Sequence, residues 1–190
     1  MTKVKIKVIT GSVRPGRFNI QPAKWITDIA SNNAELDVEL IDLQELDLPF
    51  YNEPKPAMMG DYELDHTKEW AKIIGEADGF IFVTGEYNHT YTPVLANAIN
   101  YLNAEWNYKP VSFVSYGSAA GGARAVEHLR AVAGELRMFD LREQVLIPNY
   151  FFRINNEGKY EFSKEEVDSA NVLIDELTTW TDKLKTARES

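Results

Sequence analysis

Two arginines and a serine stand close together near the start of the chain, within residues 11–19. Guanidinium and hydroxyl groups are common side-chain partners of phosphate. A strand-like run precedes this segment and an amphipathic, helix-like run follows it, so unpaired N–H groups and the positive end of the helix dipole converge there. The segment therefore predicts a phosphate site formed by Ser12, Arg14, Arg17 and the N–H groups of residues 18–20.

The kind of phosphate ligand follows from what this segment lacks. Gly11 and Gly16 have the glycine spacing of a nucleotide-triphosphate loop, but Arg17 and Phe18 stand where that loop needs Lys and then Ser or Thr. Phenylalanine cannot bind magnesium, so triphosphate hydrolysis is excluded. The Gly-x-Gly-x-x-Gly dinucleotide motif is also missing after the first strand. The segment favours a terminal monophosphate.

Two further segments, residues 84–92 and 115–122, are rich in Gly, Ser, Asn or Tyr and follow strand-like runs. Gly85 permits close approach of the backbone to a ligand, and Tyr116 can pack on a ring. Turn chemistry alone explains any one such segment. Three of them at one edge of a sheet favour a slot for a planar heterocycle that carries one phosphate.

The elements that must position these segments alternate along the chain. We predict strands at residues 3–10, 36–43, 79–84, 110–116 and 145–147, and helices at 19–31, 66–77, from 93, at 122–136 and from 163. Thr92 and Pro93 suit the start of one helix, and residues 163–166 form a capping box. The alternation predicts an α/β fold with a doubly wound parallel sheet, whose ligand lies beyond the carboxyl ends of the strands.

Composition narrows the class of protein. The chain has 190 residues, 44% of them hydrophobic, which suits one globular domain over residues 1–190. A net charge of −9 argues against nucleic acid as a partner. The absence of cysteine excludes a thiol nucleophile, and the three histidines lack metal-ligand spacing, so we expect no metal. With neither a signal-peptide core nor a membrane span in the sequence, we expect a cytoplasmic protein.

Taken together, these motifs resemble the NAD(P)H-dependent FMN reductase family of flavodoxin-like proteins, which includes quinone, azo-dye and chromate reductases. The resemblance extends from residue 5 to about residue 150, and its anchors are residues 11–19, 47–51, 85–89 and 115–125. It implies a five-stranded parallel sheet of strand order 2-1-3-4-5 with bound FMN. Two positions depart from the pattern, since many members have Ser in place of Arg17 and Pro in place of Gly85.

The resemblance also implies which residues hold the cofactor. The first loop would bind the FMN phosphate, through Gly11, Ser12, Arg14, Arg17, Phe18, Asn19 and Ile20. The second loop would line the isoalloxazine ring, through Gly85, Glu86, Tyr87 and Asn88. Backbone donors of residues 86–88 would stabilise the charge that develops on reduction. The third loop would lie on the other side of the ring, through Tyr116, Gly117 and Ser118.

The activity implied is transfer of hydride from NADPH or NADH, through FMN, to a quinone, a free flavin, an azo compound or a metal oxyanion. The flavin carries this chemistry, so no catalytic side chain is expected. Two alternatives are a non-enzymatic, flavodoxin-like electron carrier and a flavin-binding sensor; the arginines of the first loop count against the carrier. The resemblance further implies a homodimer or homotetramer, with residues 47–60 closing the flavin pocket or contacting a partner subunit.

Overall fold

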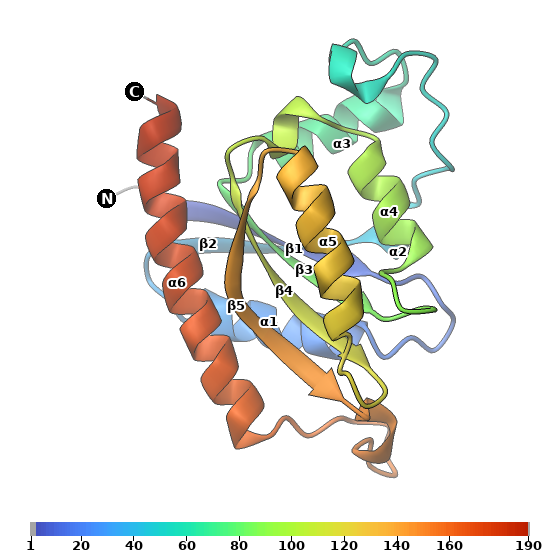
Figure 1. Ribbon diagram of the computed structural model, residues 1–190, viewed down its shortest axis with the longest axis vertical. Coiled ribbons are helices and arrows are strands. Elements are labelled where there is room, and N and C mark those ends of the chain that lie inside the picture. Colours follow the sequence, from blue (N-terminus) through green and yellow to red (C-terminus); the bar gives the residue numbers. More distant parts are fainter. Residues whose placement is uncertain (1–2, 190) are drawn as a thin grey trace.

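A five-stranded, wholly parallel sheet forms the centre of the computed structural model, which describes residues 3–189 (Figure 1). The strands are β1 Val4–Gly11, β2 Leu36–Asp42, β3 Gly79–Gly85, β4 Pro110–Gly117 and β5 Phe139–Pro148. Their order across the sheet is β2-β1-β3-β4-β5. The predicted α/β fold and strand order are therefore confirmed.

Helices cover both faces of the sheet (Figure 1). The helices are α1 Ile20–Ser31, α2 Leu43–Leu46, α3 Asp65–Gly75, α4 Pro93–Asn100, α5 Ala123–Glu135 and α6 Lys164–Glu189, with 3₁₀ turns η1 Ala57–Met59, η2 Ala104–Trp106 and η3 Tyr150–Phe152. Helices α1 and α6 pack on one face, and α3, α4 and α5 pack on the other. Within residues 3–189, no helix combines the length and the apolar character needed to cross a membrane.

The inner strands are buried on both faces because helices cover both sides of them. Every residue of β3 and β4 is buried, as expected for strands of a covered parallel sheet. Successive side chains point to opposite faces, so Phe80 and Phe82 join the core beneath α3, α4 and α5, while Ile81 and Val83 join the core beneath α1 and α6.

One strand predicted from the sequence was too short, and one helix was missed. The last strand, expected at residues 145–147, extends over Phe139–Pro148. It is an edge strand whose first half is largely exposed and carries charged residues, so its apolar run marks only part of it, and pairing with β4 sets its length. The single-turn helix α2 was not foreseen, because four residues are too short to show helical periodicity.

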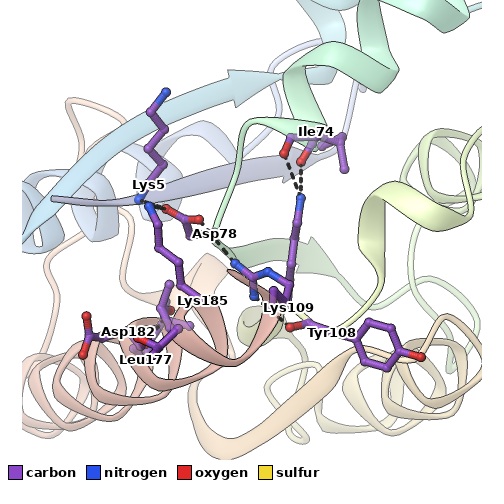
Figure 2. A network of polar contacts seen from close by, with 12 residues as sticks. Lys5, Ile74, Asp78, Tyr108, Lys109, Leu177, Asp182 and Lys185 are labelled. Atoms are coloured by element: carbon purple, nitrogen blue, oxygen red, sulfur yellow. Dashed lines mark hydrogen bonds and ion pairs between the residues drawn. The ribbon is translucent and has the colours of Figure 1, made fainter. Parts of the chain in front are cut away.

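The amino ends of the strands are joined to the last helix by one carboxylate, that of Asp78, which directly precedes β3 (Figure 2). It accepts a hydrogen bond from the backbone N–H of Lys5 at 2.9 Å and pairs with Lys185 and Arg188 of α6 at 2.8 and 3.3 Å. This network lies at the end of the sheet opposite the loops that follow β1, β3 and β4, so it supports the fold without entering the candidate site.

Candidate functional site

The sheet brings the three predicted loops together at its carboxyl edge. β1 and β4 both pair with β3, so the residues after these three strands are neighbours. Hydrogen bonds join the loops directly: the Ser12 hydroxyl lies 3.4 Å from the Tyr87 hydroxyl, and the Thr92 hydroxyl donates to the carbonyl of Gly11. These bonds join the first loop to the second, and the pairing of β3 with β4 places the third loop beside the second.

The start of α1 has the features of an anion site. Asn19 occupies the N-cap position but makes no side-chain cap, and its Nδ2 donates to the carbonyl of Val83 at 2.9 Å. Its Oδ1 is buried without a hydrogen-bond partner. Among residues 3–189 we find no acceptor for the N–H groups of Phe18, Asn19 or Ile20, and no acidic residue lies in the first turn. These donors fit a phosphate group.

The two arginines of this loop have different surroundings. Arg14 is exposed, and its guanidinium makes no hydrogen bond or ion pair with the described part of the chain. Arg17 is half-buried and pairs with Asp42, the last residue of β2. The Ser12 hydroxyl accepts from the Arg14 N–H at 3.4 Å, while the Ser12 carbonyl accepts from Arg17 at 2.7 Å. Arg14 is thus free to meet a ligand, whereas Arg17 is already engaged.

The second loop is a tight two-residue turn. The N–H of Tyr87 donates to the carbonyl of Thr90 at 2.8 Å and the reverse bond is 3.0 Å long, while Asn88 and His89 have φ angles of 50° and 69°. The N–H of Glu86 donates to the carbonyl of Tyr116 at 3.0 Å. Of the three backbone donors expected to serve the ring, those of residues 86 and 87 are therefore used by the protein itself.

The carboxylate of Glu86 is also engaged. It accepts from the Nε of Arg124 at 2.7 Å and from the backbone N–H of the same residue at 3.2 Å. Because Arg124 lies in the first turn of α5, Glu86 caps that helix and ties the second loop to the third. A role for its side chain toward the ring is not supported by these contacts.

The ring of Tyr116 is packed inside the protein. It is 5% exposed and contacts the rings of Phe18 and Tyr150, with centroids 5.0 and 5.2 Å away. Burial raises the pKa of its hydroxyl. A Cβ placed on Gly85 would lie 2.8 Å from the Tyr116 ring, so glycine is needed there. Gly117 and Ser118 follow Tyr116 in the third loop, where Ser118 is exposed.

Sequence reasoning missed two residues of this edge, Asp42 and Arg124. Each engages a predicted site residue through a contact across the fold, Asp42 with Arg17 and Arg124 with Glu86. A signal existed for Asp42, since a carboxylate at the end of a strand beside two loop arginines is a natural ion-pair partner. For Arg124 the signal was weaker, because its place beside the second loop depends on the pairing of β3 with β4.

A hollow in the described residues is separate from this edge. It has a volume of about 770 Å³ and lies between α5, β5 and α6, where its lining includes Arg130, Asp140 and Ser169. None of the residues that form it belongs to the three loops. The candidate site is instead an open surface at the carboxyl edge, as expected for doubly wound sheets.

Comparison with known proteins identifies relatives of this chain, and the matched residues include all five strands of the sheet. Residues 4–152 match the family model described as NADPH-dependent FMN reductase. An NAD(P)H-dependent FMN reductase of Schizosaccharomyces pombe is 43% identical over 136 residues, which are 70% of this chain and 68% of the relative. An NAD(P)H:quinone oxidoreductase of Solanum tuberosum is 28% identical over 184 residues, 92% of this chain and 85% of the relative.

A solved structure has the same fold. The flavoenzyme NAD(P)H:(acceptor) oxidoreductase of Paracoccus denitrificans superimposes with a TM-score of 0.73 at 21% identity. The match covers 95% of this chain and 98% of that one.

Proposed function

Because this chain belongs to the NADPH-dependent FMN reductase family, we propose that the three loops at the carboxyl edge of its sheet are the cofactor site. The protein is an FMN-dependent NAD(P)H oxidoreductase. Bound FMN would supply the transfer of reducing equivalents from the nicotinamide to an acceptor, and the residues of the chain would bind and orient it.

The observation that carries the site assignment is the uncapped start of α1. Its N–H groups have no acceptor within the described residues, its Asn19 Oδ1 is buried and unpartnered, and the exposed Arg14 and the Ser12 hydroxyl lie beside it. Such a cluster of donors favours a dianionic terminal phosphate. We propose that Ser12, Arg14 and the N–H groups of residues 18–20 bind the FMN phosphate.

The ring of the flavin is proposed to lie between the second and third loops. Gly85 permits the backbone to approach closely, and the exposed Asn88 offers the one N–H of residues 86–88 that has no acceptor in the described chain. Ser118 is exposed on the third loop. We propose that Gly85, Tyr87 and Asn88 border the ring on one side and residues 116–118 on the other, with Tyr116 supporting this surface from below.

A quinone is the acceptor that we propose. The potato relative is named for that activity, and an open site at a sheet edge allows a small planar molecule to follow the nicotinamide in the same place. A free flavin, an azo compound or a metal oxyanion would meet the same surface. The hydride donor that we propose is NADPH or NADH.

The decisive experiment is an absorption spectrum of the purified protein with FMN, followed by anaerobic NADPH and then a quinone. We expect a yellow protein that bleaches with NADPH and recovers its colour with the quinone, through many turnovers. Binding of FMN without steady NADPH consumption would favour a carrier or a sensor. Failure to bind FMN at all would overturn the proposed site and its function.

We also propose that the protein forms a homodimer or homotetramer through residues 47–60. Phe50, Met58 and Met59 are 87%, 80% and 68% exposed. The loop itself is held in place, because Tyr101 donates to the Pro49 carbonyl at 3.1 Å and Tyr51 N–H donates to Asn97 at 2.9 Å. Apolar side chains displayed on a well-anchored loop are typical of a contact surface.

Two broader expectations stay proposals. Both core clusters pack on one sheet, which supports the treatment of residues 1–190 as one domain. A cytoplasmic location is compatible with a chain that contains no cysteine.

A further inference from the structure

We propose that Arg17 is a positioning residue: it does not bind the FMN phosphate, but holds the phosphate loop in place through an ion pair with Asp42. This inference rests on the proposed FMN site and revises the expectation that Arg17 is a phosphate ligand. It assigns a task to Asp42, a residue outside the three loops.

The guanidinium of Arg17 is engaged on two sides. Its Nη1 donates to the Asp42 Oδ1 at 2.7 Å and to the carbonyl of Ser12, also at 2.7 Å, while its Nη2 donates to the Asp42 Oδ2. The contact with Asp42 is bidentate, which gives it directional specificity. The contact with Ser12 folds the loop back on itself, because it joins a residue near the end of the loop to the residue that begins it.

Asp42 is itself fixed by two neighbouring elements. Its Oδ1 accepts from the Thr10 hydroxyl of β1 at 3.1 Å and from the N–H of Gln44, in the first turn of α2, at 3.0 Å. The Leu43 N–H in turn donates to the Thr10 hydroxyl at 3.3 Å. The carboxylate therefore anchors the loop to the ends of β1 and β2 and to the first turn of α2.

Burial makes this pair difficult to open. The side chains of Arg17 and Asp42 are only 12% and 9% exposed. If Arg17 turned to a phosphate, the largely buried carboxylate would lose its cation, and an uncompensated buried charge is strongly unfavourable. Arg14, which is exposed and has no partner in the described chain, meets a phosphate without such a loss. The loop thus has one arginine suited to hold it and one suited to bind.

The test compares the dissociation constants of FMN and of riboflavin, which lacks the phosphate, by quenching of flavin fluorescence. The proteins are the wild type, Arg17→Ala, Asp42→Ala and the double variant. We expect each single change to weaken FMN binding on the order of tenfold, the double variant to be no weaker than the single ones, and riboflavin binding to change little. Such non-additivity is the signature of two residues that act as one unit.

A direct phosphate ligand would behave differently. If Asp42→Ala binds FMN as tightly as the wild type or more tightly, while Arg17→Ala loses affinity, the positioning role is overturned. A wild type that fails to bind FMN would instead refute the proposed function, so the two failures are distinguishable.

A conservative variant gives a second, independent reading that does not depend on the stability of Asp42→Ala. Lysine keeps the positive charge but cannot form the bidentate contact. We expect Arg17→Lys to lose as much FMN affinity as Arg17→Ala. If Arg17→Lys retains most of the affinity, the charge itself contacts the phosphate and the inference is wrong.

Discussion

At the scale of single residues, the site depends on which polar groups the protein leaves free. Asp42 illustrates the physics: burial alone would raise its pKa, but hydrogen bonds from Arg17 and from the Gln44 N–H hold the pKa below the usual range. It therefore stays ionised and keeps Arg17 engaged. The exposed guanidinium of Arg14 has no such competitor, which makes it the side chain best placed to bind an anion.

Replacing Arg14 tests this distinction. We expect Arg14→Ala to weaken FMN binding by about 1.5–3 kcal/mol, because a hydrogen bond to a charged group is lost, with riboflavin binding unaffected. Arg142→Ala is the matched control, since that side chain is 93% exposed and lies on β5. Equal FMN affinity of the Arg14 variant and the control, measured by fluorescence titration, would contradict the assignment.

Replacing Gly85 tests the close packing of the second loop on Tyr116. An added Cβ would lie 2.8 Å from the ring, so we expect Gly85→Ala to destabilise the protein by about 1–3 kcal/mol and to weaken FMN binding. The control is Gly134→Ala within α5, where a Cβ meets nothing within 4 Å. It should stabilise by about 0.5–1 kcal/mol. Urea unfolding measures both, and a stable Gly85→Ala would refute the packing argument.

At the scale of elements, the ends of helices and strands are joined by buried charges far from the site. The Lys109 side chain, at the residue before β4, donates to the carbonyls of Ile74 and Gly75 at 2.8 and 3.1 Å (Figure 2). These are the last carbonyls of α3, where a cation is favourable. Burial nevertheless lowers the pKa of Lys109 from 10.5 to about 8.

This shift makes stability depend on pH. Between pH 8 and 10.5 the unfolded chain binds more protons at Lys109 than the folded chain does, so the free energy of unfolding contributed by this residue rises with pH. Lys109→Met removes that contribution. We expect the free energy of unfolding of the wild type, minus that of the variant, to increase from pH 7.5 to pH 9.5 in urea titrations. A constant difference would show that Lys109 titrates normally.

At the scale of the whole molecule, an acidic protein carries an exposed arginine at the candidate site. Its loop of residues 47–60 carries three of the most exposed large apolar side chains of the described residues. The net charge is −9, so the protein as a whole repels anions. Binding of a phosphate therefore depends on local donors such as Arg14 rather than on the overall electrostatic field. Phe50, Met58 and Met59, the most exposed large apolar side chains of the loop of residues 47–60, are those through which we propose that a second copy binds.

The assembly is testable by mass. We expect wild-type protein to have at least twice the chain mass of 21.6 kDa in light-scattering chromatography. The double change Met58→Asp with Met59→Asp should reduce it to one chain, because it places charges in an apolar contact. Val172→Asp is the control, as that side chain is 53% exposed on α6. A wild-type mass of 21.6 kDa would overturn the proposal.

The amino-acid sequence by itself determined most of the elements and the place of the candidate site. Hydrophobic periodicity and capping residues are local signals: Thr92 caps α4, and Ser163 and Glu166 exchange the reciprocal hydrogen bonds of a capping box. The candidate anion site before α1 can likewise be predicted from sequence, because its hydrogen-bond donors lie close together in the chain. Local patterns of this kind specify which loops meet a ligand once the sheet is parallel.

Only the tertiary structure decided which of those groups remain available. Arg17 and Asp42 are 25 positions apart and meet only because β1 and β2 are paired. The N–H of Glu86 is used because β4 lies beside β3, and the full length of β5 is likewise set by that neighbour. Local sequence patterns do not show which distant segments pair with each other. The sequence thus gives the type and position of each hydrogen-bond donor. Whether that donor is free to bind a ligand depends on the folded structure.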